Sequence, residues 1–390
     1  MSESSAAFSS PQLQRKQTRS CLSTTLLPIV FPVALAAVLY LLEPFKPVHF
    51  PSRELPRRTG TALAVNPRMR VGSEVLVEGK VDGPEDLAYD KRNRLIYTGC
   101  KDGWIKRITV NKSGADSVVK NWVNTGGRPL GLAWEKTGEL IVADADLGLL
   151  RVTENGKKPK VEVLANEHEG LKFNLTDGVD VGEDGTIYFT DATYKYSLKD
   201  FIFDIAEGKP HGRFMSYNPA TKKVELLARN LYFANGVAVA PDQKFVVYCE
   251  TILKRCRKIY LRGPKKGRIG EFCPDLPGMP DNIHYVGQGQ YFIGMVTSIS
   301  TPQCYLLLRY PFIRKTAAIV SKYFTRPKLE MRGGVMVVDL AGKLTNHYYD
   351  PQLSLISSGI KVDNYIYCGS MSYPFLLRLD VVKYPAIPAA

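Results

Sequence analysis

The chain has 390 residues, of which 45% are hydrophobic, and 52 Lys and Arg against 38 Asp and Glu give a formal net charge of +14. The part that follows the first 55 residues is too long for an ordinary β-sandwich and suits one large β domain. The basic residues are scattered, and no zinc-finger, helix-turn-helix or RNA-binding motif accompanies them, so composition excludes these nucleic-acid-binding classes.

The N-terminal segment has the charge pattern of a membrane anchor. A polar, basic stretch precedes Cys21–Leu42, in which 22 residues carry no charge, enough for a helix that crosses a bilayer. The predicted organisation is a cytosolic tail at 1–20, a transmembrane signal anchor at 21–43, a linker at 44–69 and the main domain at 70–390.

A cleaved signal peptide is the alternative, with the small residues at 34–37 as processing sites. Both interpretations send the main domain into the secretory pathway, and the anchor would hold it on the lumenal side of the endoplasmic reticulum, the vacuole or the plasma membrane. Asn111-Lys-Ser and Asn174-Leu-Thr are candidate glycosylation sites there.

Seven cysteines without a CxxC pair argue against zinc or thioredoxin-like chemistry. In an oxidising compartment they allow one or two disulfides, whose pairing the spacing leaves open. The alternative is that most of them are small buried strand residues.

The main domain contains one pattern six times: a small or polar residue, an alternating strand, a turn and a second strand. Examples are EDLAYDKRNRLIYTGC at 85–100 and DGVDVGEDGTIYFTDA at 177–192. The second residues of the six copies lie 45, 47, 58, 46 and 77 residues apart; they are Asp86, Gly131, Gly178, Gly236, Asn282 and Gly359. Blades of four antiparallel strands need roughly 40 to 50 residues. The spacing therefore predicts an all-β protein, a six-bladed β-propeller, with insertions in the two long steps.

The first residue of each copy should occupy the same height around the propeller axis. These residues are Glu85, Leu130, Asp177, Asn235, Asp281 and Ser358. Four of them are carboxylates or amides, and Asn282 is adjacent. Converging oxygen ligands favour calcium or magnesium over zinc or copper. The alternative is that each is an ordinary turn residue bonded to its own backbone.

Two segments do not follow the repeated strand–turn–strand pattern of the blades. Residues 295–332 mix aromatic, aliphatic and basic residues at near-helical spacing. They could form a lid, an amphipathic element on a membrane, or an insertion helix packed on blades five and six. Residues 195–213 are expected to cover the same face, with Phe201 and Phe203 lining an apolar pocket.

The stretch from about 210 to 295, including GRFMSYNPATKKVELLARNLYFANGVAVAPDQKFVVYCE, resembles the core of the strictosidine synthase family. The similarity extends over roughly 70–385 and includes the plant strictosidine synthase-like proteins and the animal adipocyte plasma membrane-associated protein. More distantly, the family resembles paraoxonases, gluconolactonases and regucalcin. These resemblances imply a six-bladed propeller with calcium or another divalent ion in its central tunnel, behind an N-terminal membrane anchor.

The resemblance also implies which residues hold that ion. The paraoxonase-type metal shell corresponds to Glu85, Asp177, Asn235 and the Asp281-Asn282 pair. These are the residues found above at the first position of the repeat copies, or beside it. Strictosidine synthase itself condenses an amine with an aldehyde through a glutamate in the sixth blade. The corresponding stretch here, 350–370, contains no glutamate, so this activity is the weaker alternative.

The sequence therefore predicts a calcium-dependent hydrolase of small esters or lactones, with a small-molecule substrate in the tunnel. The ion would polarise the carbonyl, and His284 or Asp177 would transfer the proton. His284 shares a strand face with Asn282, although a strand histidine is more often a packed residue. A non-catalytic, membrane-anchored binding or scaffold protein is the remaining alternative, because a fold alone does not assign an activity.

Overall fold

The computed structural model describes residues 34–35, 37–51, 63–111, 113–154, 156, 158–298, 302–323 and 332–389. The chain forms two compact units, 1–44 and 45–390. In the first unit, residues 37–42 are helical; the predicted tail and most of the predicted anchor at 21–43 lie outside the described residues. Among the residues that the structure describes, no helix is long and apolar enough to cross a membrane.

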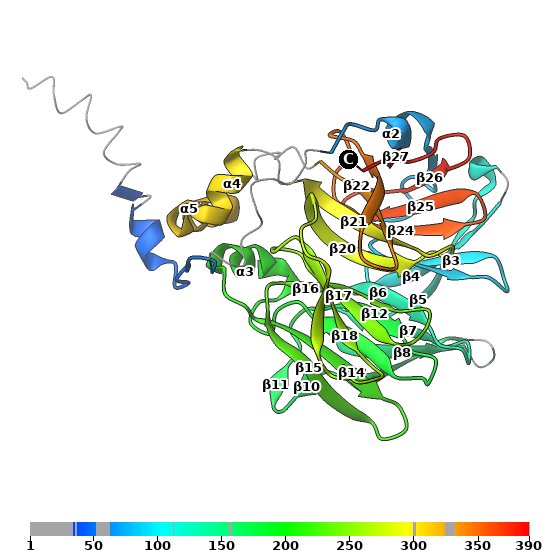
Figure 1. The fold of residues 1–390 in the computed structure, drawn as a ribbon, viewed down its shortest axis with the longest axis horizontal. Coiled ribbons are helices and arrows are strands. Elements are labelled where there is room, and N and C mark those ends of the chain that lie inside the picture. Colours follow the sequence, from blue (N-terminus) through cyan, green and yellow to red (C-terminus); the bar gives the residue numbers. More distant parts are fainter. Residues whose placement is uncertain are drawn as a thin grey trace, which may run out of the picture. The chain divides into compact units, whose positions relative to one another are not determined.

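The second unit is the predicted six-bladed propeller (Figure 1). Each blade is an antiparallel sheet; in blades one to four the strands follow in sequence from the centre outwards, whereas blades five and six each add a strand from a terminal part of the domain. The first three blades are β2 (Leu87–Asp90), β3 (Leu95–Gly99), β4 (Trp104–Thr109), β5 (Val119–Asn124); β6 (Pro129–Trp134), β7 (Leu140–Asp144), β8 (Gly148–Thr153), β9 (Lys160–Ala165); and β12 (Thr176–Val181), β13 (Ile187–Asp191), β14 (Gly212–Asn218), β15 (Lys223–Leu231).

The other three blades complete the ring. They are β16 (Ala234–Val239), β17 (Phe245–Glu250), β18 (Arg255–Tyr260), β19 (Ile269–Cys273); β20 (Gly278–Tyr285), β21 (Gln290–Ser298), β22 (Gly334–Asp339), β23 (Leu344–Tyr349), β27 (Ile387–Pro388); and β24 (Ile356–Val362), β25 (Tyr365–Ser370), β26 (Leu376–Asp380) with β1 (Glu74–Leu76). The innermost strands contact one another in a closed circle, β2, β6, β12, β16, β20 and β24.

An N-terminal strand closes the ring. β1 pairs with β26 in the register Val75 opposite Leu377, so the sixth blade takes its outer strand from the start of the domain. Arg378, 1% exposed, binds Glu74 across this pair with a 2.5 Å contact. The short helix α2 (Arg68–Gly72) leads into β1, and its Met69 is buried in the core.

The core lies between neighbouring blades rather than inside any one of them. Apolar side chains of blade two, such as Ile141 and Leu149, pack on Phe189 and Met215 of blade three. This arrangement explains the near-continuous burial of the second strands: both faces of β7 and β13 are covered by the adjacent sheets.

The two long repeat steps contain the predicted insertions. Between β13 and β14 lie a 3₁₀ turn (Leu198–Asp200) and α3 (Phe201–Glu207); between β21 and β22 lie α4 (Pro302–Arg309) and α5 (Pro311–Tyr323). α5 packs on α3 and α4, so the interpretation that it packs on blades five and six was wrong in its location. Phe203 packs on Phe45 and Ala318 in a small core instead of lining a pocket.

The minor elements are a 3₁₀ turn (Gly114–Asp116) and the hairpin β10 (Glu167–His168) with β11 (Leu171–Lys172). The described parts of the predicted linker at 44–69 are not a free spacer. Phe45 and Phe50 are buried against the insertion helices, and Asn66 donates to the carbonyl of His347 at 3.1 Å. The compact unit that contains the propeller starts at residue 45.

A disulfide joins Cys249 of β17 to Cys256 of β18, which face each other across the hairpin of blade four. The cysteines at 100, 273 and 368 are buried and free. Asn111 lies exposed after β4. Asn174 is half-buried and donates its amide to the carbonyl of Tyr194 at 2.5 Å, which leaves it less accessible as a glycosylation site.

Candidate metal centre

Polar side chains gather where the innermost strands begin. Glu85 lies just before β2, Asp177 and Asn235 lie in β12 and β16, and Asp281 and Asn282 lie in β20. All five are buried, none with more than 4% of its surface exposed. The structure therefore brings together the five predicted metal ligands.

Three of these residues approach one another closely. Carboxylate oxygens of Glu85, Asp177 and Asp281 lie within 4.8 Å of one another. Asn282 donates its amide to Oε1 of Glu85 at 2.7 Å. The second carboxylate oxygens of Glu85 and Asp281, and Oδ1 of Asn235, are buried without a hydrogen-bond donor. Buried polar atoms without partners are rare, and these three oxygens have the chemistry of ligands for a cation.

The crowding of carboxylates changes their ionisation. Burial raises the pKa of Glu85 well above its usual range, and the charges of Asp281 and Asp86 raise it further, against Arg128 and Asn282. Burial also raises the pKa of Asp177, reinforced by Glu85 and Asp86. The pKa of Asp281 is raised by burial and then by Asp177, while a hydrogen bond from Asn235 opposes the change. Three acids in one apolar setting cannot all ionise without a compensating positive charge.

Glycines at the repeat positions allow this convergence. A Cβ on Gly131 would lie 2.4 Å from the carbonyl oxygen of Asp177, and one on Gly236 would lie 2.4 Å from that of Asp281. Each inner strand therefore lies directly against the site residue of the next blade. Any larger residue at these positions would push the ring apart.

A second polar cluster adjoins the carboxylates. Nε2 of His284 lies 2.6 Å from Oδ1 of Asp86, and the Ser358 hydroxyl donates to the same oxygen at 2.7 Å. The other oxygen of Asp86 accepts the backbone N–H of Leu132 at 3.0 Å. Burial opposes charge on His284, but Asp86, with help from Asp180, outweighs it and raises the imidazole pKa. His284 is thus held by a carboxylate, and not packed as an isolated strand histidine.

Arg128 is a site residue that the comparison of the repeats missed, because it lies two residues before Leu130, the first residue of the second copy. It is 7% exposed, its Nη2 donates to the carbonyl of Gly83 at 2.8 Å, and its Nη1 is buried without an acceptor. Burial lowers its pKa and Glu85 opposes that change. In the sequence, an arginine that directly precedes the apolar residues Pro129 and Leu130 is the signal that could have identified it.

Leu130 and two further histidines lie apart from the centre. Leu130, the first residue of the second repeat copy, is buried in an apolar cluster. His168 lies in the β10–β11 hairpin, and Nδ1 of His211 is held at 2.7 Å by Asp204 of α3. Neither histidine belongs to the carboxylate cluster.

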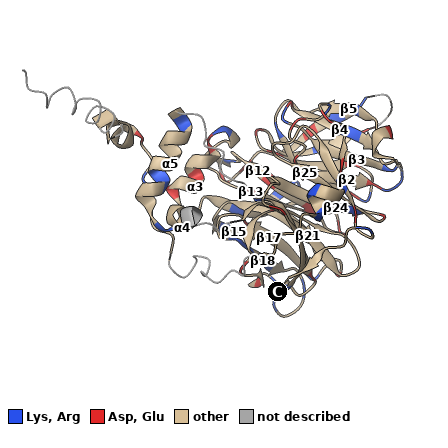
Figure 2. Ribbon diagram, turned by 90° about the horizontal axis from the view of Figure 1, so that it is seen from above, with Lys and Arg blue, Asp and Glu red and all other residues tan. Residues whose placement is uncertain are grey.

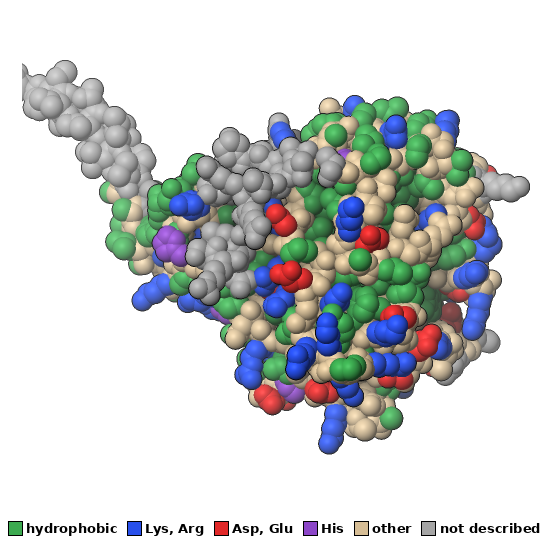
Figure 3. All heavy atoms as spheres, viewed as in Figure 1, with side chains coloured by type: hydrophobic (Ala, Val, Ile, Leu, Met, Phe, Trp, Pro, Cys, Tyr) green, Lys and Arg blue, Asp and Glu red, His purple; other side chains and the backbone are tan. Residues whose placement is uncertain are grey.

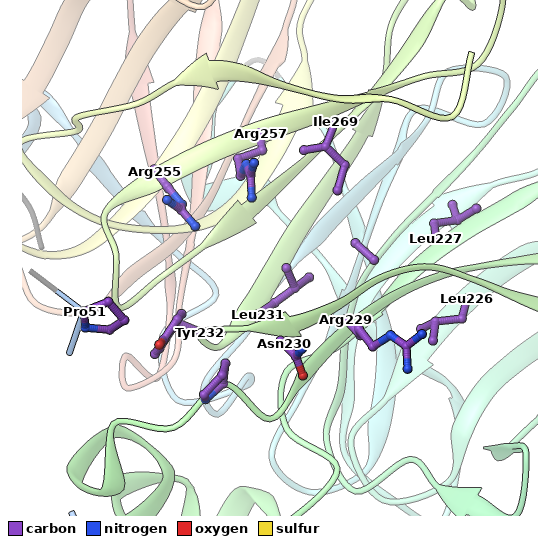
Figure 4. Close-up of a pocket in the computed structure, with 12 residues that line it drawn as sticks. Pro51, Leu226, Leu227, Arg229, Asn230, Leu231, Tyr232, Arg255, Arg257 and Ile269 are labelled. Atoms are coloured by element: carbon purple, nitrogen blue, oxygen red, sulfur yellow. The ribbon is translucent and has the colours of Figure 1, made fainter. Parts of the chain in front are cut away.

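A groove on the outside of the blades is also distinct from this centre. It has a volume of ≈ 800 Å³ and lies between the outer strands of blades three and four. Arg229, Tyr232, Arg257 and Ile269 are among the residues around it (Figure 4). Basic side chains are likewise scattered over the blades and not gathered into one stripe on the face that Figure 3 shows (Figures 2 and 3).

The residues of the centre fit a hard divalent cation. The set offers carboxylate and amide oxygens, with three of them lacking donors, and it contains neither sulfur nor a histidine within the carboxylate cluster. Calcium takes six to eight such ligands, and magnesium also prefers oxygen. The protein is therefore a closed six-bladed propeller with a buried cluster of oxygen ligands where its innermost strands begin.

Comparison with known proteins identifies the family. Residues 177–264 match the strictosidine synthase family and residues 62–108 match the N-terminal region of strictosidine synthase-like proteins. Strictosidine synthase-like 6 of Arabidopsis thaliana is 47% identical over 92% of this chain and 95% of its own length. Adipocyte plasma membrane-associated protein of Rattus norvegicus is 30% identical over 89% and 96%. The chain belongs to the strictosidine synthase-like family.

Solved structures share the fold at low identity. A gluconolactonase from Xanthomonas campestris has a TM-score of 0.57 at 18% identity, covering 87% of this chain and 99% of its own. Regucalcin from Agrobacterium tumefaciens, described as a calcium-binding protein, has a TM-score of 0.54 at 12% identity, covering 78% and 92%. These likenesses establish the propeller fold alone.

Proposed function

We propose that this protein is a divalent-cation-dependent hydrolase of small esters or lactones, with calcium as the ion. The observation that carries the proposal is the cluster of Glu85, Asp177 and Asp281 within 4.8 Å, beside donorless oxygens. Gluconolactonase and regucalcin share this fold and bear names that state lactone hydrolysis and calcium binding, which supports the proposal.

The ion would be held by Glu85, Asp177, Asn235, Asp281 and Asn282. When bound, it supplies a positive charge that polarises a carbonyl and stabilises the developing oxyanion. Arg128 is proposed to orient the substrate, because its buried Nη1 can donate to a carbonyl or carboxylate oxygen. The low-dielectric surroundings strengthen that hydrogen bond.

Proton transfer is assigned to His284. Asp86 holds Nε2 of its ring, so Nδ1 is the atom left to exchange a proton with the substrate or water. Asp177, the other predicted proton carrier, belongs to the carboxylate cluster, where burial and the neighbouring carboxylates raise its pKa. Asp177 is therefore proposed as a ligand of the ion rather than as the main proton carrier.

Strictosidine synthesis is not favoured by the sixth blade. At the start of β24 the tunnel wall presents Ser357 and Ser358. Asp350 is buried before the strand beside Arg70 at 3.4 Å, and Asp363 pairs with Arg94 at 3.0 Å in the turn after it. None of these residues replaces the catalytic glutamate of that reaction.

The membrane anchor at 21–43 and a secretory location remain proposals. The uncharged stretch from Cys21 to Leu42 supports the anchor. The Cys249–Cys256 disulfide supports an oxidising compartment, where such bonds persist.

The test is hydrolysis of aryl esters and lactones by the full-length protein, with calcium and with chelator. Activity should disappear on chelation and in Asn235→Ala and Asp281→Ala, while Asp184→Asn, in an exposed turn of blade three, retains it. A folded, calcium-stabilised protein that lacks activity would overturn the hydrolase and favour a binding or scaffold role.

A further inference from the structure

The helices inserted in blade five expose large apolar side chains. α5 buries Arg314 and Lys315 together with Ala318 and Ile319, whereas Phe312 is 58%, Val320 39% and Tyr323 52% exposed. These three residues follow a spacing of eight and three, which places them on one face of the helix. At the junction with α4, Leu306 and Tyr310 are also exposed, at 42% and 38%.

The buried cations fix the direction of this face. Arg314 donates Nε to the carbonyl of Ala206 at 3.1 Å, Nη1 to that of Leu308 at 2.6 Å, and Nη2 to that of Val48. Its guanidinium lies 4.5 Å from the ring centre of Phe50. The buried side of α5, which carries Arg314, is therefore bound to α3 and to the segment 45–51, and Phe312, Val320 and Tyr323 are exposed. Figures 1 and 2 show α5 beside α3.

The charge of this region has one sign. Residues 302–323 contain four basic residues and no acidic residue. Arg309 and Lys322, near the ends of the two helices, are exposed. An apolar face bordered by cations is typical of helices that lie in the interface of an anionic bilayer.

Chain continuity points to the same surface. The uncharged stretch Cys21–Leu42 ends three residues before Phe45, and Phe45 is buried against Phe203 of α3, with its ring 5.3 Å from Nζ of Lys315 in α5. The uncharged stretch is therefore followed within three residues by a side chain that packs on α3 and α5.

The exposed face also lies at the end of the propeller that carries the carboxylate cluster. Ser298 at the end of β21 pairs with Gly278 at the start of β20, and Asp191 at the end of β13 pairs with Thr176 at the start of β12. The insertions that follow β13 and β21 thus leave from the end of the blades where the site residues lie.

We propose that the exposed face of α4 and α5 rests on an anionic membrane surface, as a contact separate from the N-terminal segment. Phe312, Val320 and Tyr323 would enter the interface, and the flanking cations would meet lipid headgroups. The contact would turn the end of the tunnel that holds the carboxylates towards the bilayer. It is independent of the proposed hydrolase activity.

The test places a fluorophore on the face in the full-length protein, reconstituted into vesicles of phosphatidylcholine and phosphatidylserine with brominated acyl chains. Phe312→Trp is compared with Val163→Trp, whose parent residue is 51% exposed on β9 of blade two. Bromolipid should quench the added emission of Phe312→Trp at least about twofold more than that of Val163→Trp, because an interfacial helix buries its apolar face among acyl chains. Equal quenching overturns the proposal.

A second measurement needs no substitution on the face. Amide exchange at 306–323 in the wild-type protein should slow in anionic vesicles compared with detergent micelles of neutral headgroup, and Phe312→Asp with Tyr323→Asp should abolish the difference. Protection that is the same in micelles but grows with protein concentration would instead assign the face to a second copy of the chain, against the proposal.

Discussion

Two sets of buried acids lie in the propeller, an inner set in blades one, three and five and an outer set in blades two, three and four. The inner set, Glu85, Asp177 and Asp281, lies at the starts of the first strands. The outer set consists of the last residues of three second strands, Asp144, Asp191 and Glu250. Burial is equally complete in both, but the supply of donors differs.

Every oxygen of the outer set has a partner. Asp144 accepts the N–H of Arg128 at 3.1 Å and the hydroxyl of Thr125 at 2.7 Å. Asp191 accepts the N–H of Leu175 at 3.1 Å and binds Arg213 at 2.7 Å. Glu250 accepts the N–H of Tyr232 at 3.0 Å and binds Arg255 at 2.6 Å.

These contacts show what the outer set does. Each acid accepts a backbone N–H from the segment that leads into the innermost strand of its own blade, β6 for Asp144, β12 for Asp191 and β16 for Glu250. Asp191 thereby holds the segment that leads to Asp177 of the inner set. A complete set of donors therefore marks a structural carboxylate, and donorless oxygens mark a carboxylate available to a cation.

The largest effect should come from the outer set. Asp191→Ala leaves the guanidinium of Arg213, 6% exposed, without its partner, and should lower the free energy of unfolding by about 3–5 kcal/mol. Denaturant unfolding measures the loss. Removing both charges, in Asp191→Leu with Arg213→Met, should recover part of it; a loss below about 1 kcal/mol for Asp191→Ala would remove the contrast between the two sets.

The inner set should respond in the opposite direction. In chelator, Asp281→Asn relieves repulsion among the acids and should stabilise the protein by about 1–2 kcal/mol, since one pKa unit corresponds to about 1.4 kcal/mol. Calcium at 100 times its Kd should stabilise the wild type by about 2.7 kcal/mol, and this gain should be lost in the variant. Thermal unfolding with and without calcium measures both. Destabilisation in chelator would make Asp281 structural.

The sequence predicted the inner set because its three residues are each the first residue of a repeat copy, and equivalent positions lie at one height around the propeller axis. Strand alternation also gave the six blades, since each pair of adjacent copies forms one interface. The same comparison could have found Asp144, Asp191 and Glu250, which end the strands IVAD, YFTD and VVYCE. Their role could not be predicted, because the backbone N–H donors come from residues 16 to 18 positions away whose approach only the folded blade defines.

Other features depend on contacts with no periodic signal. The contact between His284 and Asp86 joins residues 198 positions apart, and the burial of Phe45 depends on α3 and α5, two insertions in different blades. A repeat reveals what is common to all blades. It cannot show what one blade does for another.

The inner set should also make stability depend on pH. The pKa values of Glu85, Asp177 and Asp281 are raised in the folded state, so in chelator the folded protein binds more protons than the unfolded chain above about pH 4. Stability should be full below that pH and fall as pH rises through the raised pKa values, by up to about 1.4 kcal/mol per pH unit for each extra proton.

Calcium should remove this decline, because the ion compensates the charges of the ionised acids. Urea unfolding from pH 4 to 8, with and without calcium, measures the slopes. Glu85→Gln should flatten the slope in chelator, while the exposed variant Asp184→Asn should leave it unchanged. A slope that persists in saturating calcium would show that these acids do not hold the ion.

The smallest effect separates two adjacent serines. Ser357 and Ser358 are both fully buried in β24, but the hydroxyl of Ser357 donates to the backbone carbonyl of Glu85 at 2.6 Å, whereas that of Ser358 donates to the side chain of Asp86 at 2.7 Å. Replacement of either by alanine should cost about 1 kcal/mol, the usual net value of one hydrogen bond. Denaturant unfolding should therefore not distinguish them.

The imidazole of His284 should distinguish them. Without the Ser358 hydroxyl, Asp86 directs more of its negative charge to Nε2 of His284, so Ser358→Ala should raise the pKa of His284 further, and Ser357→Ala should not. NMR titration of the histidine ring measures both variants whether or not the protein is active. Equal behaviour would mean that Asp86 holds His284 without help from Ser358, and the second cluster would then reduce to a simple ion pair beside the inner set.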